Sequence, residues 1–379
     1  MRNSQYIIIA IALAVALTGI DAQSETVIEE HISTEYENVR LVRVVGDLEH
    51  PWAVAFLPDD SMLVTERGGR LLHVRDGETT ALSGVPELVS ISQGGLLDVA
   101  VHPDYEDNGW VYITFSEGDS DGTATTLARG QIEGDAFTNA EVIFQQDRHS
   151  SPGRHYGSRL AFMDDGTLLM TIGDRGADPP RAQDLGDHAG SLLRLNDDGS
   201  PAEGNPFEDL AYAHDEIYSY GLRNIQGFAI DPMTGIIWAT DHGPRGGDEL
   251  NVIEAGKNYG WPVVSLGRDY GTEEQWGQSR RREGMEKPVW EFLPTLAPSG
   301  LAIVRDSQFS NWEGNILAGG LRSKQILRIV VEGHTVVHIE ALLRDKIGRI
   351  RDVRLGPDGA VYVVTDESDG GVYRMEPAQ

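Results

Sequence analysis

Short apolar segments separated by Pro-Asp, Asp-Gly and Gly-Gly turns recur along most of the chain. The first unit has apolar segments at residues 52–56, 62–66 and 70–74, with Pro58-Asp59 and Gly68-Gly69 between them. Runs of about five apolar residues bounded by such turn residues are typical of β-strands in antiparallel sheets. Related units begin at residues 52, 97, 160, 228, 301 and 353.

These six units predict an all-β fold, a six-bladed β-propeller with four-stranded antiparallel blades. One blade leaves both of its apolar faces exposed, whereas six blades packed around an axis bury them, and propeller repeats are typically ~40–50 residues long. A pair of packed sheets, the β-sandwich, is the alternative that the pattern leaves open. A strand near residues 40–45 is expected to join the sheet of the last unit, which closes the ring and protects its edges.

Residues 23–379 are expected to form this single domain. The polar residues 24–37 are predicted to be a lead-in, and residues 117–136, 175–216 and 267–287 are predicted to be long connections. Connections of this length are usually functional or mobile. The triplet Arg280-Arg281-Arg282 in the last of them is interpreted as a solvated face.

Residues 1–22 have the pattern of an export signal. Arg2 supplies the positive charge, residues 6–20 are almost entirely apolar, and Ala22 ends the segment with a small residue. A retained membrane anchor is the alternative, but the apolar run is shorter than the ~20 residues that span a bilayer. We therefore predict a periplasmic or secreted protein with no stable membrane insertion after the signal is cleaved.

The overall charge and the cysteine content exclude several classes of function. The formal net charge is −29 and the acidic residues are spread along the whole chain, which argues against binding to nucleic acid. The chain has 0 cysteines, so disulfides, thiolate nucleophiles and cysteine-ligated metals are excluded. In so acidic a protein, local groups of arginines stand out.

Two polar loops that lead into apolar strands carry candidate chemistry. His155 lies in the glycine-rich loop SPGRHYGSR at 151–159, and histidine has a pKa suited to a general base. Arg223 and Asn224 lie in the loop SYGLRNIQG at 219–227, where an arginine fork matches planar anions. A structural histidine and a surface salt bridge are the alternatives.

A glycine-rich acidic segment, DHGPRGGDELN at 241–251, offers hard oxygen donors. Asp248, Glu249 and the carbonyl groups of Gly243 and Pro244 are ligands of the kind that calcium prefers. The segment lacks the spacing of an EF-hand, so its pattern alone indicates calcium without fixing the ligand set.

A set of arginines favours a small polyanionic ligand. Arg349 and Arg351 alternate along a predicted strand and therefore share a face. Together with Arg322 and Arg223 they would form a basic pocket. The chain has neither a Walker loop nor a dinucleotide fingerprint, so a nucleotide cofactor is not expected.

With these motifs in order, the chain resembles the soluble sugar dehydrogenases that depend on pyrroloquinoline quinone (PQQ), especially the bacterial aldose sugar dehydrogenase branch. The resemblance covers residues 48–376. It rests on the motifs LEHPWAVAFLPD at 48–59, QGGLLDVAVHPDY at 93–105, HYGSRLAF at 155–162, TIGDRG at 171–176, YGLRNIQGFAIDP at 220–232, HGPRGGDELN at 242–251, NYGWP at 258–262, TLAPSG at 295–300 and RIRDVRLGPDG at 349–359.

The resemblance implies a role for each matching residue, with PQQ lying over the central channel. His155 matches the catalytic base, and Arg223 would stabilise negative charge on the reduced quinone. The residues implied for cofactor binding are Gln93, Asp174, Arg223, Asn224, His242, Thr295, Arg322, Arg349, Arg351 and Asp366. Calcium is implied at the cofactor through Gly243 and Pro244, and at a second, structural site through Glu249 and Tyr259.

Three positions depart from the glucose-specific members of that family. His242 stands in place of a glutamine, Arg322 in place of a cofactor-binding lysine, and Leu293 in place of a tryptophan beside the sugar. Loss of that tryptophan favours a broad or different substrate range.

The function expected from the sequence is therefore oxidation of an aldose sugar, or of another alcohol, by a PQQ- and calcium-dependent dehydrogenase. Electrons would pass to a quinone or a small redox protein. A propeller lactonase with a calcium ion in the channel, and a ligand-binding propeller without catalysis, are the alternatives.

Overall fold

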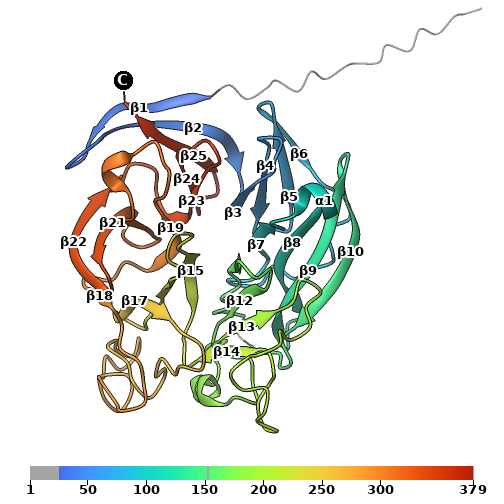
Figure 1. The fold of residues 1–379 in the computed structure, drawn as a ribbon, viewed down its shortest axis with the longest axis vertical. Helices are drawn as coiled ribbons and strands as arrows, with labels where there is room; N and C mark the ends of the chain where they lie inside the picture. Colours follow the sequence, from blue (N-terminus) through green and yellow to red (C-terminus); the bar gives the residue numbers. More distant parts are fainter. Residues whose placement is uncertain (1–24, 152, 379) are drawn as a thin grey trace, which may run out of the picture.

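Six antiparallel sheets are arranged around a central axis in a computed structural model that describes residues 25–151 and 153–378 (Figure 1). The prediction of a six-bladed β-propeller is confirmed, and the β-sandwich alternative is wrong. The predicted signal at 1–22 lies outside the described residues. In the described part of the chain, no helix is long and apolar enough to cross a membrane.

Each of the first five blades is a four-stranded meander. Blade 1 holds β3 (Pro51–Phe56), β4 (Met62–Glu66), β5 (Leu71–Arg75) and β6 (Glu78–Ala81), and blade 2 holds β7 (Leu96–Val101), β8 (Trp110–Gly118), β9 (Thr123–Glu133) and β10 (Ala136–Gln145). Blade 3 holds β11 (Leu160–Phe162), β12 (Leu168–Ile172), β13 (Ser191–Leu195) and β14 (Ile217–Tyr220), and blade 4 holds β15 (Ile225–Ile230), β16 (Ile237–Asp241), β17 (Asp248–Ile253) and β18 (Trp290–Phe292). Blade 5 holds β19 (Pro298–Ile303), β20 (Ile316–Gly320), β21 (Gln325–Glu332) and β22 (Thr335–Leu342).

The sixth blade combines the two ends of the chain. It holds β23 (Ile350–Leu355), β24 (Val361–Thr365) and β25 (Gly370–Pro377), and β2 (Asn38–Leu48) pairs antiparallel with β25. The predicted ring closure is therefore confirmed. The expectation of a lead-in at 24–37 is wrong, because β1 (Thr26–Ser33) pairs with β2 and adds a fifth strand at the outer edge.

Two predicted connections also contain strands. Most of 117–136 belongs to β8 and β9, and β13 lies within 175–216. The segment 267–287 has no strand and remains a long connection, as predicted. The helical elements are a short helix, α1 (Tyr105–Asn108), and the 3₁₀ turns η1 (Pro179–Gln183) and η2 (Ser310–Trp312).

The hydrophobic core consists of clusters between neighbouring blades. Leu168 and Met170 of β12 pack toward blade 2 through Tyr112, whereas Leu169 packs toward blade 4 with Phe228. Because both faces of a blade are covered, every residue of β12 is buried and all but Thr171 are apolar; the Thr171 hydroxyl accepts a hydrogen bond from the backbone N–H of Arg159.

The first strand of each blade is the innermost, and these six strands contact one another around the axis. A first strand begins, and the antiparallel second strand ends, at the same mouth of the ring. The loops that lead into first strands and those that follow second strands therefore meet there, and the predicted site residues lie in these loops.

A buried ionic network lies beneath that mouth. Arg159 pairs with Asp98 at 3.2 Å and with Asp352 at 3.0 Å, and Arg354 pairs with the same two carboxylates. A second cavity, lined by Val54, Val99, Leu160 and Arg354 among others, lies at the far ends of the first strands. The network therefore lies between the two openings of the channel.

Candidate functional site

All six blades contribute to a cavity of about 470 Å³ at the mouth of the channel. This volume lies within the range of roughly 300–1,000 Å³ that is usual for small-molecule sites. The residues that precede first strands or follow second strands and line the cavity include Arg67, Gln93, Arg154, His155, Asp174, Arg223, Asn224, His242, Gly243, Pro244, Leu321, Arg349 and Asp366.

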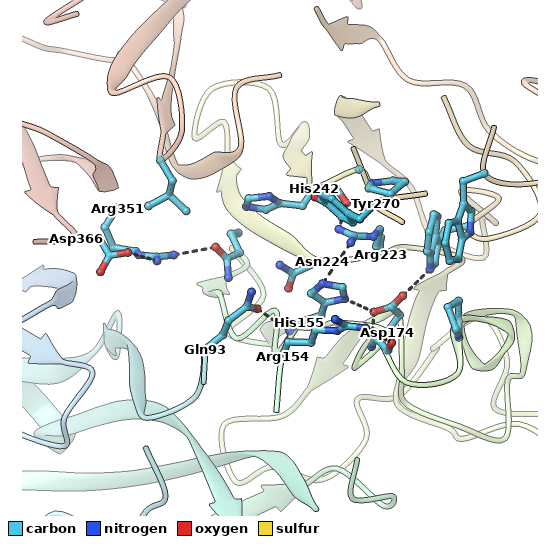
Figure 2. A pocket seen from close by; sticks show the side chains of 18 of the residues that line it. Gln93, Arg154, His155, Asp174, Arg223, Asn224, His242, Tyr270, Arg351 and Asp366 are labelled. Carbon is cyan, nitrogen blue, oxygen red and sulfur yellow. Dashed lines mark hydrogen bonds and ion pairs between the residues drawn. The ribbon is translucent and has the colours of Figure 1, made fainter. Parts of the chain in front are cut away.

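His155 lies on the floor of this cavity with its ring held from two sides (Figure 2). Its Nδ1 is 2.6 Å from Asp174 Oδ1, and its Nε2 is 3.3 Å from a terminal nitrogen of Arg223. Because the carboxylate accepts from Nδ1–H, the lone pair of Nε2 is directed toward Arg223 and the cavity. This is the arrangement of an oriented general base.

The backbone around His155 adopts conformations that non-glycine residues seldom take. His155, Ser158 and Arg175 have φ values of 54°, 82° and 61°. A Cβ added at Gly173 would lie 2.1 Å from the carbonyl oxygen of His155, so this strand end must be glycine. Such strain is retained where the surrounding structure holds a residue in a required position.

Asp174 is fixed by two further donors. Trp261 Nε1 donates to its Oδ2 at 2.7 Å, and the backbone N–H of Gly176 donates to its Oδ1 at 2.8 Å. Burial acts to raise the pKa of Asp174, but the hydrogen bond from His155 and the charge of Arg223 outweigh it and lower this pKa. Asp174 therefore remains a carboxylate that orients His155.

The pKa of His155 is also lowered. Burial is the main cause, the charge of Arg223 adds to it, and the Asp174 carboxylate acts in the opposite direction. His155 is therefore neutral near pH 7, which is the form that accepts a proton.

Two arginines lie across the cavity from this dyad, on blade 6. Arg351 and Arg349 bind Asp366 at 2.8 Å and 3.1 Å, and His50 Nδ1 lies 2.9 Å from the same carboxylate. Burial acts to raise the pKa of Asp366, but Arg351 above all lowers it, so Asp366 is ionised. Arg351 also donates to Gln226 at 2.9 Å.

Several polar atoms at the cavity have no partner within the described residues. His242 Nε2 and Arg351 Nε are buried without a hydrogen bond. Neither the carbonyl oxygen of Gly243 nor that of Pro244 accepts a hydrogen bond from the part of the chain described. Buried polar groups are normally satisfied, so the two nitrogens fit a ligand that carries acceptors, and the two carbonyl oxygens beside them are available to a cation.

Four residues assigned from the sequence lie outside the cavity lining. Thr295 donates to Asp248, which also accepts from the backbone N–H groups of Gly243 and Ala297. Thr295 therefore supports the segment 241–251 by its hydrogen bond to Asp248. Arg322 is exposed in the turn after Leu321.

Glu249 and Tyr259 are the other two assigned residues that lie outside the cavity lining. Burial, with the neighbouring Asp241, raises the pKa of Glu249 to about 8, and Asn251 donates to it at 3.3 Å. Burial likewise raises the pKa of Asp241 to about 6. The Tyr259 hydroxyl donates to the Val252 carbonyl. Asp241 accepts from the backbone N–H groups of Arg223 and Asn224. Within the described residues neither Asp241 nor Glu249 forms an ion pair, so the two carboxyls fit a cation.

The cavity also has an aromatic wall that the sequence analysis did not identify. Trp276 stacks on Trp261 with ring centroids 5.4 Å apart and an interplanar angle of 16°. Tyr270 and Asp269, from the same long connection, also line the cavity. Leu293 is exposed outside the lining, so the aromatic surface comes from residues 261–276.

Arg67 and Arg154 are further lining residues that were not assigned to the site. Arg154 precedes His155, and Arg67 directly follows β4, as Gly173 directly follows β12. Their place relative to the repeat, at the ends of second strands or before first strands, is the signal that would have identified them.

Comparison with known proteins gives the family. The family model described as "Glucose / Sorbosone dehydrogenase" matches residues 48–374. The chain belongs to the glucose/sorbosone dehydrogenase family. Among curated proteins, it is 40% identical over 344 residues to an aldose sugar dehydrogenase of Escherichia coli K12, covering 89% of this chain and 92% of that protein.

Solved structures agree with this assignment. The apo form of the soluble aldose sugar dehydrogenase of E. coli has a TM-score of 0.86 and 38% identity, covering 89% of this chain and 99% of that one. The PQQ-bound form of an aldose sugar dehydrogenase from Streptomyces coelicolor has a TM-score of 0.73 and 28% identity, covering 93% and 98%. The resemblance inferred from the motifs is confirmed.

Proposed function

We propose that this member of the glucose/sorbosone dehydrogenase family is a PQQ- and calcium-dependent dehydrogenase that oxidises aldose sugars at C1 to lactones. The observation that carries the proposal is the opposition of a His155–Asp174 dyad to an arginine pair across one cavity of a very acidic protein. A lactonase would need the base but has no use for Arg349 and Arg351.

The unpartnered groups of the cavity fit the proposed cofactor. PQQ is a planar tricarboxylate, and Arg223, Asn224, Arg349, Arg351 and Gln93 offer the donors that such an anion needs. His242 Nε2 and Arg351 Nε would complete their hydrogen bonding on it. The Gly243 and Pro244 carbonyl oxygens would hold calcium, which accepts backbone carbonyl ligands. Bound PQQ supplies a two-electron acceptor for a hydride.

The chain's own residues account for the proton. His155 Nε2 would accept the proton of the C1 hydroxyl, while the hydrogen on C1 leaves as a hydride with its electron pair. The C1–O bond then becomes a carbonyl, and the product is a lactone. Asp174 stabilises the imidazolium that forms, and Arg223 stabilises negative charge in the cavity.

The aromatic wall is the proposed sugar side of the cavity. Trp276 and Tyr270 offer ring faces to the C–H groups of a pyranose, and Asp269 can accept from sugar hydroxyls. Other alcohols of similar size are alternative substrates, because Leu293 lies outside the cavity lining and the aromatic surface is supplied by residues 261–276 instead.

The pH dependence of kcat/KM follows from the lowered pKa of His155. The base must be neutral, so we expect the acidic limb below pH ~6.5, the ordinary histidine value, with a plateau at neutral pH. Arg223→Gln removes the charge that lowers this pKa, so the limb should move to higher pH, whereas Arg223→Lys should leave it near its original position. A limb above pH ~6.5 in the unmodified protein would contradict the assignment.

We expect calcium to stabilise the protein through the second proposed site. Adding calcium after chelation should raise the melting temperature, and Glu249→Gln should remove much of that rise because a charged ligand is lost. Thr272→Ala, in the long connection, is the control and should retain it. An equal calcium-dependent rise in Glu249→Gln would exclude Glu249 as a ligand.

Export and electron transfer complete the proposal. The signal pattern at 1–22 would deliver the protein to the periplasm or the medium, and N-terminal sequencing of the mature chain tests this. Electrons would leave to a quinone or a small redox protein that reaches the same mouth.

The whole proposal is tested by titrating chelator-treated protein with PQQ and calcium, following quinone absorbance. Aldoses and an artificial electron acceptor are then added. Saturable, calcium-dependent binding followed by sugar-dependent bleaching is expected, and the bleaching rates rank the sugars. Binding without bleaching by any sugar or alcohol would reject the dehydrogenase, and absence of binding would reject the cofactor.

A further inference from the structure

A second group of metal-ligating side chains lies away from the cavity, where blade 2 meets blade 3. Asp147 follows β10, His188 precedes β13, and His214 precedes β14. One ligand atom from each lies within 4.8 Å of the others. None of the three lines the cavity, so the group is separate from the proposed active site.

Both histidines face the same carboxylate. His188 Nδ1 is 3.0 Å from Asp147 Oδ1, and His214 Nε2 is 3.2 Å from Asp147 Oδ2. The two rings stack with centroids 4.0 Å apart and an interplanar angle of 18°. The His188 side chain is 4% exposed, whereas those of Asp147 and His214 are 29% and 30% exposed, so the group is open to solvent on one side.

The other side of His188 fixes its tautomer. Its Nε2 is 2.7 Å from Glu216 Oε1, and an ionised carboxylate only accepts hydrogen bonds, so Nε2 carries a hydrogen. Its Nδ1 and Asp147 Oδ1, 3.0 Å apart, share a second proton. A divalent cation bound by both atoms would displace that proton.

We propose that this cation is a divalent transition metal of the zinc class, bound by the Asp147 carboxylate, His188 Nδ1 and His214 Nε2, with water as the fourth ligand. Two imidazoles and one carboxylate suit Zn²⁺, Ni²⁺ or Cu²⁺, whereas calcium prefers oxygen ligands alone. Glu216 contacts Nε2 of His188, and a carboxylate in this position commonly orients a histidine that binds a metal through its other ring nitrogen.

Binding requires one adjustment. Imidazole lone pairs lie in the ring planes, so two nearly parallel rings cannot both point at one ion. The His214 side chain is 30% exposed, and its ring nitrogen contacts Asp147, which is itself a proposed ligand, so this ring can turn toward the ion, whereas His188 stays held by Glu216. The ion would replace the shared proton of the cluster.

The place of the cluster gives the ion a structural role. Asp147 begins the segment that carries His155, and His188 and His214 belong to blade 3. Next to them, Arg148 and Arg181 both pair with Asp187, and Arg181 also donates to Ser150. A metal ion at this point would fasten the base-bearing segment to blade 3 without contacting the substrate.

The test is zinc titration by calorimetry of chelator-treated full-length protein in excess calcium, which occupies the oxygen-ligand sites. We expect one zinc ion per chain, release of protons and a higher melting temperature. Cu²⁺ at one equivalent should give an electron paramagnetic resonance spectrum with coupling to two imidazole nitrogens. Absence of saturable binding, or coupling to fewer than two nitrogens, would overturn the proposal.

Variants separate this site from adventitious binding. His214→Ala leaves His188 and Glu216 in place and should weaken zinc binding at least tenfold, and Asp147→Asn should do the same. His338→Ala removes an exposed histidine that pairs with Glu35 and is the matched control. Equal zinc affinity in His214→Ala and the unmodified protein would show that the cluster shares only a proton.

Discussion

Replacing His155 with alanine is expected to lower kcat by about 10²–10⁴-fold while leaving the Kd for PQQ within a few-fold of its original value. General base catalysis has typically this magnitude, and the ring contributes no charge to the proposed arginine cradle. Its Nδ1 contact with Asp174 and its Nε2 contact with Arg223 are lost together. Turnover is measured with saturating sugar and an artificial acceptor.

The matched control is His149→Ala. His149 lies in the same loop, its side chain is 45% exposed, and its ion pair is with Glu117 at the surface. We expect nearly unchanged turnover. If His155→Ala retained normal kcat with full PQQ loading, the base would have to be another group, and the role of the Asp174 dyad would be lost with it.

Arg351→Ala is expected to weaken PQQ binding by about 10–100-fold. A hydrogen bond to a charged group contributes about 1.5–3 kcal/mol, and each 1.4 kcal/mol corresponds to a tenfold change in Kd. Arg351 is buried, pairs with Asp366 and Gln226, and has Nε without a partner at the cavity. Fluorescence or absorbance titration with PQQ in excess calcium measures the change.

Two companion variants keep this prediction interpretable. Removing a buried partner destabilises the fold, by about 3–5 kcal/mol for a buried ion pair, so melting temperatures accompany each titration. Arg349→Ala removes a side chain that is 40% exposed and should weaken PQQ with less loss of stability. Arg322→Ala is the control outside the cavity lining, and equal losses in Arg322→Ala and Arg351→Ala would contradict the cradle.

The inner part of each blade could be predicted from the sequence, whereas the outer part could not. First and second strands are buried on both faces, so all residues of β12 except Thr171 are apolar. Outer strands such as β6, with the sequence ETTA, and β1 are largely exposed and partly polar, so their patterns resemble loops. The predicted lead-in at 24–37 failed for this reason.

Part of the candidate site could likewise be predicted from the sequence, and part could not. His155, Arg223 and Arg351 adjoin apolar strands in recognisable motifs, and the structure brings them to one cavity. The support for Asp174 could not be predicted, because its Trp261 donor is 87 residues away and lies in a segment without regular structure. Trp276 stacks on that tryptophan from the long connection, whose polar sequence gave no sign of contact with the site.

The buried ionic network of Arg159, Asp98, Asp352 and Arg354 has a consequence for the kinetics of the proposed reaction. It lies between the cavity and the far ends of the first strands, so we expect both substrates of the proposed reaction to enter through the same mouth and to do so in turn. The lactone has to leave before an electron acceptor can approach the reduced cofactor. Turnover should then follow double-displacement kinetics, with parallel double-reciprocal plots when sugar is varied at several acceptor concentrations.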